Sequence, residues 1–333
     1  MKFLVMAIML LTALLVACGS NQIEQLEESS LLNVVTTVSP ITSIVENIGG
    51  NRILVRGIVP EGANSHTFDP PPSTARVLAN ADLFIANGLY LEEPAIKMFN
   101  ANHGDGARAV LLGELAIAPE EWQFDFSFPE ANGQPNPHLW PDPILALKYA
   151  GIVRDALMTL DPNGASYYGV NYKEFRLRIE TLDAAIKTAV ATVPEGQRHL
   201  LTYHDSWAYF ARRYGFEVLG AVQPADFTEP SPRDMANLIA QVRDLGVPAI
   251  FGSEVFPSPV MEQIASESGA VFIDQLADDD LPGDPGDAGH SYLGLMTENM
   301  VTMVRALGGD ASALGAVDSS LVFDGQSHAE YPG

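Results

Sequence analysis

Three histidines and one aspartate occupy positions in this chain that suit a metal site. His66 lies in a proline-rich loop that leaves a predicted strand, and His138 lies between prolines just before a predicted helix. His204 and Asp274 each follow directly on a predicted strand. Because ligands of open α/β sheets bind beyond the carboxyl ends of the strands, these four side chains could face one crevice. Imidazole nitrogens and a carboxylate oxygen are a ligand set typical of zinc or manganese.

The spacing of the four residues follows no short ligand motif. A single histidine is more often a solvated or hydrogen-bonded residue than a ligand. The four together favour a metal site because two come from each half of the chain. Glu254, which follows another predicted strand, could hydrogen-bond a ligating imidazole, or it could be a buried structural carboxylate.

The remaining histidines lack a partner pattern. His103, His199 and His328 are expected to be structural or solvated. His290 is expected at the surface, rather than as a residue that captures metal transiently. The run from Asp278 to Asp284 looks like a calcium loop, but it has neither the alternating acidic spacing nor the distal glutamate of an EF-hand. We interpret it as a mobile acidic loop.

Two lobes joined by a rigid helix would bring these candidates together. The stretch 166–193 has no proline, and no glycine past Gly169, and its apolar residues recur at intervals of four and three. This pattern predicts a helix of about 40 Å. Strands alternate with helices on both sides of it, which implies a parallel sheet in each half. We therefore predict an α/β fold of two lobes, each a parallel sheet with flanking helices, joined by one long linker helix.

The predicted elements divide the chain into six segments. These are a signal peptide (1–18), a flexible tether (19–32), an N-terminal α/β lobe (33–162), the linker helix (163–195), a C-terminal α/β lobe (196–309) and a surface tail (310–333). Strands are predicted at 34–38, 53–59, 83–86, 109–112, 199–203, 216–222, 249–251 and 270–273. Helices are predicted at 40–48, 73–79, 144–160, 206–214, 232–245, 259–268 and 292–307.

The N-terminus carries a lipoprotein signal. Lys2 precedes an almost wholly apolar run from Phe3 to Val16, which is too short for a confident membrane span. The run ends in LVACG, which resembles the lipobox of bacterial lipoproteins. Cys18 is the only cysteine, so no intramolecular disulfide can form. Lipidation of Cys18 would anchor the mature chain outside the cytoplasmic membrane, in the periplasm or at the cell surface, and leave no thiolate for copper(I) or an iron–sulfur cluster.

Composition indicates a globular protein and disfavours binding to polyanions. The chain has 333 residues, which favours two domains, with 47% hydrophobic and 18% charged residues, as in a globular protein. Its net charge of -24 disfavours binding to nucleic acid or to an anionic membrane surface.

The loop GIVPEGANSHTFDPPPS resembles the signature of the cluster A-I solute-binding proteins, the zinc- and manganese-binding lipoproteins of metal ABC transporters. The resemblance continues in order through both halves, from residue 33 to 308, in NADLFIANGLYLE, NPHLWPDP, LTYHDSWAYFARRYGFEV, EPSPRDMANLIAQVRDLGVPAIF and FIDQLADD. That family joins its lobes by one long helix. Its metal ligands correspond to His66, His138, His204 and Asp274 of this chain.

The resemblance implies a transport receptor and not an enzyme. The receptor would bind a divalent cation outside the cytoplasm, deliver it to a permease with its ATPase, and act as a monomer. A histidine as the third ligand indicates zinc, because manganese-preferring members usually carry glutamate there. The histidine-rich loop of many zinc members is absent, and Asp69 stands where a glutamate is commoner. Three alternatives stay open: a manganese receptor, a zinc-dependent hydrolase with Asp274 or Glu254 as base, and a surface adhesin.

Overall fold

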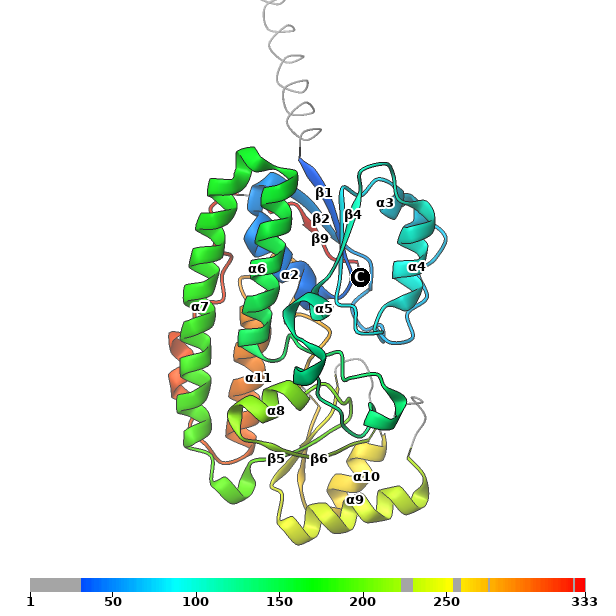
Figure 1. Ribbon diagram of the computed structural model, residues 1–333. Coiled ribbons are helices and arrows are strands. Elements are labelled where there is room, and N and C mark those ends of the chain that lie inside the picture. Colours follow the sequence, from blue (N-terminus) through cyan, green and yellow to red (C-terminus); the bar gives the residue numbers. More distant parts are fainter. Residues whose placement is uncertain (1–30, 223–229, 254–258, 275, 326, 333) are drawn as a thin grey trace, which may run out of the picture.

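The computed structural model in Figure 1 has two sheets, one in each lobe, with the long helix α7 running beside both. The structure describes residues 31–222, 230–253, 259–274, 276–325 and 327–332. Cys18, Glu254 and nearly all of the predicted tether lie outside these ranges. Within them, no helix is both long enough and apolar enough to cross a membrane.

The N-terminal lobe is built on a five-stranded parallel sheet of order β4-β3-β1-β2-β9. Its strands are β1 (Leu32–Thr36), β2 (Ile53–Gly57), β3 (Leu83–Ala86), β4 (Arg108–Leu111) and β9 (Ala329–Glu330). Its helices are α2 (Ser39–Gly49), α3 (Thr74–Ala79), α4 (Glu93–Asn102), α5 (Leu112–Ala116) and α6 (Pro143–Leu160). Asp142 caps α6 by accepting bonds from the N–H groups of Ile144 and Leu145, with Pro143 in the first helical position.

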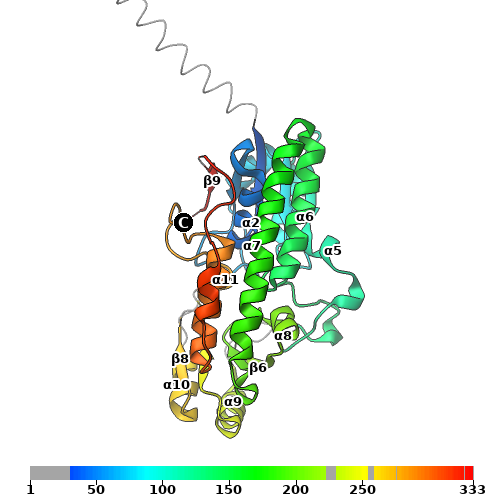
Figure 2. The ribbon, with the colours of Figure 1, turned by 90° about the vertical axis from the view of Figure 1, so that its left-hand side faces the viewer.

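The helix α7 (Ala165–Ala191) is the predicted linker. Its 27 residues run past α6, α2 and α11 (Figure 2), so it contacts elements of both lobes. The apolar stripe predicted from the sequence is its buried face, which includes Tyr168, Phe175, Ile179, Leu182, Ile186 and Ala189. The helix ends just before Pro194, which cannot continue a helix without losing a hydrogen bond.

The C-terminal lobe is built on a four-stranded parallel sheet of order β6-β5-β7-β8. Its strands are β5 (His199–Thr202), β6 (Glu217–Ala221), β7 (Ala249–Phe251) and β8 (Val271–Ile273). Its helices are α8 (Ala208–Tyr214), α9 (Pro232–Leu245), α10 (Pro259–Ser268) and α11 (Tyr292–Ala306). The helix α11 packs against both α7 and α2, so one large apolar core extends from the N-terminal lobe along α7, and a smaller core lies around the second sheet. The predicted fold class is confirmed.

Three features differ from the prediction, and the first is the short helix α5, which was not predicted. The helix α4 was not predicted, because it buries only Ala95 and Phe99 and so has a weak apolar pattern. The tail after residue 310 does not simply lie on the surface: its strand β9 pairs with β2, and Leu314 is fully buried. Short 3₁₀ turns complete the fold at Gly50–Arg52, Pro119–Glu121, Glu130–Asn132, Pro162–Gly164, Glu195–Gln197 and Ser312–Ala316.

Candidate metal centre

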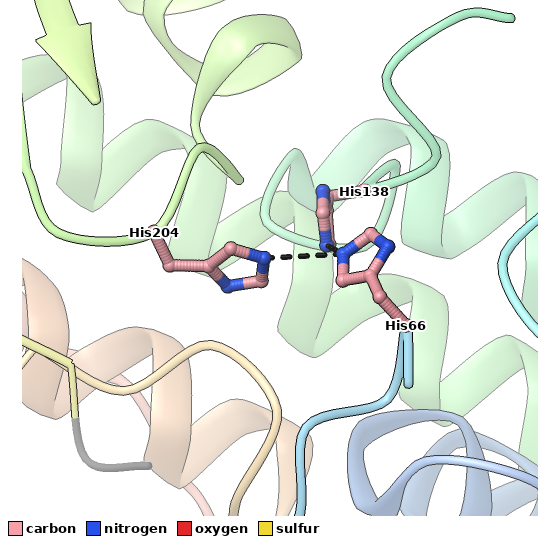
Figure 3. Close-up of side chains that lie close together, drawn as sticks. All are labelled: His66, His138 and His204. Carbon is pink, nitrogen blue, oxygen red and sulfur yellow. Dashed lines mark hydrogen bonds between the residues drawn. The ribbon is translucent and has the colours of Figure 1, made fainter. Parts of the chain in front are cut away.

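Three of the four predicted ligands meet between the lobes. Figure 3 shows the rings of His66, His138 and His204 turned toward one another. His66 comes from the loop after β2, His138 from the loop before α6, and His204 from the loop after β5. The Nε2 atom of His66 lies 3.0 Å from that of His138 and 3.1 Å from that of His204. His138 is fully buried, and His204 is 8% exposed.

A neighbouring oxygen atom fixes which nitrogen of the His138 ring carries the hydrogen. The Nδ1 atom of His138 lies 2.8 Å from Oδ1 of Asn136. An amide oxygen only accepts hydrogen bonds, so this Nδ1 is the donor. In the neutral ring, Nε2 of His138 therefore presents its lone pair toward His66. The Nδ1 atom of His204 lies in close contact with Oδ2 of Asp278, 2.6 Å away. Nitrogen ligands of one tetrahedral zinc ion lie about 3.3 Å apart, close to the observed separations.

Burial favours the neutral forms of two of these imidazoles. It lowers the pKa of His66 and of His138 well below the usual histidine value, and the proximity of His204 lowers both pKa values further. Neutral rings are the forms that bind metals. The site is thus ready to accept a cation at neutral pH.

The structure does not bring Asp274, the fourth predicted ligand, into this group. Its side chain is exposed, one residue after the end of β8. The loop that follows instead directs Asp278 to His204, and Asp279 to the hydroxyl of Ser65, 2.6 Å away.

The acidic run, which we interpreted as a mobile acidic loop, therefore has its first two aspartates buried. Asp278 and Asp279 are 3% and 4% exposed, and the carboxylate of Asp280 accepts a bond from the N–H of Gly62. Asp279 and Asp280 therefore hold the loop that carries His66. The clustering of aspartates in the sequence does not indicate these contacts.

Asn136 is a second functional residue that sequence reasoning missed. Besides accepting from His138, it donates to Oδ2 of Asp125 at 2.6 Å and to the backbone oxygen of Asp205 at 2.7 Å. Burial raises the pKa of Asp125, and the nearby Asp205 raises it further. Since Asp205 follows His204 in the chain, Asn136 links the positions of two predicted ligands from different lobes. The sequence feature that could have indicated this role is the position of Asn136, two residues before His138.

Replacing Asn136 by alanine is expected to weaken zinc binding about 10- to 100-fold, the usual cost of losing a partner that orients a ligand. The His138 ring would lose the acceptor that fixes its tautomer. Calorimetric zinc titration measures the affinity, and histidine nitrogen NMR reports the tautomer. The control is Asn102→Ala, on the exposed end of α4. An unchanged affinity and tautomer would show that Asn136 does not orient His138.

The other four histidines differ in their exposure to solvent. His103 is exposed, and His199 and His328 are partly buried. His290, expected at the surface, is 6% exposed and lies against the ring of Tyr331. The expectation for His290 was wrong because the C-terminal tail covers it.

The fold and the site together define a class of protein. Two parallel-sheet lobes joined by a long helix, with three converging imidazoles between them, form a bilobal binding protein for a metal cation. Residues 34–306 match the family described as zinc-uptake complex component A, periplasmic. The chain belongs to this family.

Several relatives with named metals are similar over most of the chain. The manganese-binding lipoprotein MntA of Halalkalibacterium halodurans is 29% identical over 92% of this chain and 97% of its own length. The zinc-binding protein TroA of Treponema pallidum is 29% identical over 82% of this chain and 88% of its own length. The iron-binding protein YfeA of Yersinia pestis is 28% identical over 83% of this chain and 86% of its own length. These names include three metals, so similarity alone does not select one.

Solved structures agree with the fold. The structure of the periplasmic zinc-binding protein TroA superposes with a TM-score of 0.76 at 29% identity, covering 83% of this chain and 99% of that one. Family membership makes this chain an extracytoplasmic receptor for a divalent metal ion of an ABC uptake system, and not an enzyme. The hydrolase alternative receives no support from these comparisons.

Proposed function

We propose that the chain captures zinc outside the cytoplasm and presents it to the permease of an ABC transporter. The observation that carries this proposal is the convergence of three imidazole Nε2 atoms in one site, where His138 and His204 are buried and His66 is partly buried. Zinc binds well to imidazole, whereas manganese favours carboxylate, carbonyl and water oxygens. A manganese receptor is the second candidate, supported by the similarity to the manganese-binding MntA.

The proposed zinc ligands are His66, His138, His204 and Asp274. Asp278 and Asp279 already contact His204 and Ser65, whereas Asp274 is exposed at the strand end. Its carboxylate would therefore have to turn inward when zinc binds. A fourth protein ligand would complete a closed tetrahedral shell, which suits capture rather than catalysis.

The test is a calorimetric titration of the chelator-stripped full chain, in detergent, with zinc and with manganese. We expect one tight zinc site and weaker manganese binding. Replacing His204 by glutamate exchanges a nitrogen ligand for oxygen and should reduce the preference for zinc over manganese at least about tenfold. Tighter manganese than zinc binding by the unaltered chain would overturn the choice of zinc. Unchanged zinc affinity in Asp274→Ala would remove Asp274 from the ligand set.

We further propose that acyl chains on Cys18 anchor the receptor and that it works as a monomer beside the permease and its ATPase. The lipobox-like LVACG supports the anchor, as does the word lipoprotein in the names of relatives. Mass spectrometry of the chain from its native membrane is expected to show a diacylated or triacylated N-terminal Cys18. An unmodified cysteine, or a signal peptide still attached, would contradict the anchor. Light scattering measures the molar mass in solution and is expected to give that of a single chain.

A further inference from the structure

A second group of ionisable side chains lies under the C-terminal tail, apart from the three clustered imidazoles. It comprises Glu46 of α2, Glu61 of the loop after β2, and His290, which stands just before α11. Tyr331 of the tail covers it, and Figure 2 shows β9 of the tail beside the N-terminal lobe. Glu46 is 5% exposed and His290 is 6% exposed.

His290 is buried without a hydrogen bond from either ring nitrogen to any described residue. Its Nε2 atom lies 3.8 Å from Oε1 of Glu61, which is too long for a hydrogen bond, and this oxygen also lacks a partner among the described residues. The ring of Tyr331 stands edge-on to His290 with centroids 4.7 Å apart. Buried polar atoms without partners are costly, so three such atoms side by side require an explanation.

Two carboxyl groups, of Glu46 and Glu61, are the acidic neighbours of His290. The carboxylate of Glu46 accepts bonds from the hydroxyl of Tyr331 at 2.6 Å and from Ser327. Burial raises the pKa of Glu46 and of Glu61, and Asp284 raises that of Glu61 further. Among the described residues, the only basic group found to oppose both shifts is His290. Burial thus disfavours the charged forms of both carboxyl groups, and a bound cation would offset that cost.

We propose that His290 and Glu61 bind a second divalent cation, with Glu46 as the adjacent carboxylate that adds negative charge. Two ligands of one zinc ion lie about 3.3 Å apart, so a shift of about 0.5 Å would bring Nε2 and Oε1 into place. An imidazole and carboxylates suit zinc or manganese, and water would complete the shell. With fewer protein ligands, this site is weaker than the three-imidazole site.

The second site would tie together parts that also build the first. Glu61 shares its loop with His66, and His290 follows the loop whose Asp278 contacts His204. Tyr331 belongs to the tail, which lies outside the 34–306 family match. A cation here would stabilise the tail and both loops in their present packing, and it is distinct from the transported ion.

The experiment titrates zinc alone into the full chain in detergent after the first site is removed by His66→Ala and His138→Ala together. Because the proposed function depends on the removed site, zinc binding by this double variant tests the second site separately from the proposed function. We expect one remaining zinc equivalent, with an affinity at least about tenfold lower than that of the unaltered chain. Adding His290→Gln or Glu61→Gln should abolish it, whereas His103→Gln, on an exposed histidine, should not.

Glu61 is partly exposed, so Glu61→Gln provides a variant that is easier to fold than one altering the buried His290. Circular dichroism checks that each variant is folded. Absence of zinc binding in the folded double variant would overturn the proposal and leave His290 as a buried neighbour of the two glutamates. Binding that survives both His290→Gln and Glu61→Gln would place the ion elsewhere and overturn it equally.

Discussion

Replacing His138 by alanine is expected to weaken tight zinc binding by more than about 100-fold, because loss of a ligand exceeds the 10- to 100-fold cost of losing a partner that merely orients one. His138 is fully buried, and its Nε2 lies 3.0 Å from that of His66. Its removal leaves at most two imidazoles, too few to fill a tetrahedral shell without water. Competition against a chelator of known zinc affinity measures the change.

The matched control for this substitution is His103→Ala, which removes an imidazole from the exposed end of α4. The control should bind zinc as the unaltered chain does. His138→Ala is judged only if its circular dichroism spectrum matches that of the parent, since it leaves a cavity in a buried site. Tight binding by the folded variant would mean that zinc is held elsewhere.

Zinc affinity is expected to persist to lower pH than ordinary histidines would allow. A site with two imidazoles of the usual pKa would bind zinc about 100-fold more weakly at pH 5.5 than at pH 7.5, because protons compete with the metal at each ring. Burial lowers the pKa of His66 and of His138 well below the usual value, so these rings stay neutral there. The expected fall between pH 7.5 and 5.5 is therefore well under about 100-fold.

The same shifts determine how the stability of the metal-free protein depends on pH. In the unfolded chain both histidines bind protons near the usual pKa of about 6.5, whereas in the folded chain they do not until lower pH. Their contribution to stability is therefore fully present above that value and is lost as the pH falls below it. Zinc titrations and thermal unfolding from pH 7.5 to 5.5 measure both effects. A fall in affinity of about 100-fold or more, with unchanged stability, would contradict the burial of these rings.

The sequence predicted the elements with strong periodic patterns, and three of the four predicted ligands at their ends lie together in the structure. The linker helix α7 was predictable because its apolar stripe is continuous, and β3, β7, α9 and α10 occur at the predicted bounds. His66, His138 and His204 were predictable because each stands at the carboxyl end of a strand or before a helix, where parallel sheets place ligands. Loop residues with contacts far along the chain carry no such periodicity.

Asp278 is the clearest example of a loop residue whose contact the sequence does not indicate. It stands 74 positions from His204, a separation at which no local pattern indicates the 2.6 Å contact between them. The burial of His290 depends in the same way on the tail, whose Tyr331 reaches back to Glu46 of α2. Both arrangements arise from tertiary packing, so the sequence indicated only an acidic surface loop and a polar tail.

The most direct test of the metal centre is zinc K-edge X-ray absorption on the full chain loaded with less than one equivalent of zinc. The structure predicts a four-coordinate shell with nitrogen or oxygen ligands at about 2.0–2.1 Å. Three of them should show the multiple scattering of imidazole rings, from His66, His138 and His204. Fewer than three imidazoles, or an octahedral shell of oxygen atoms, would contradict a zinc receptor built on these three histidines.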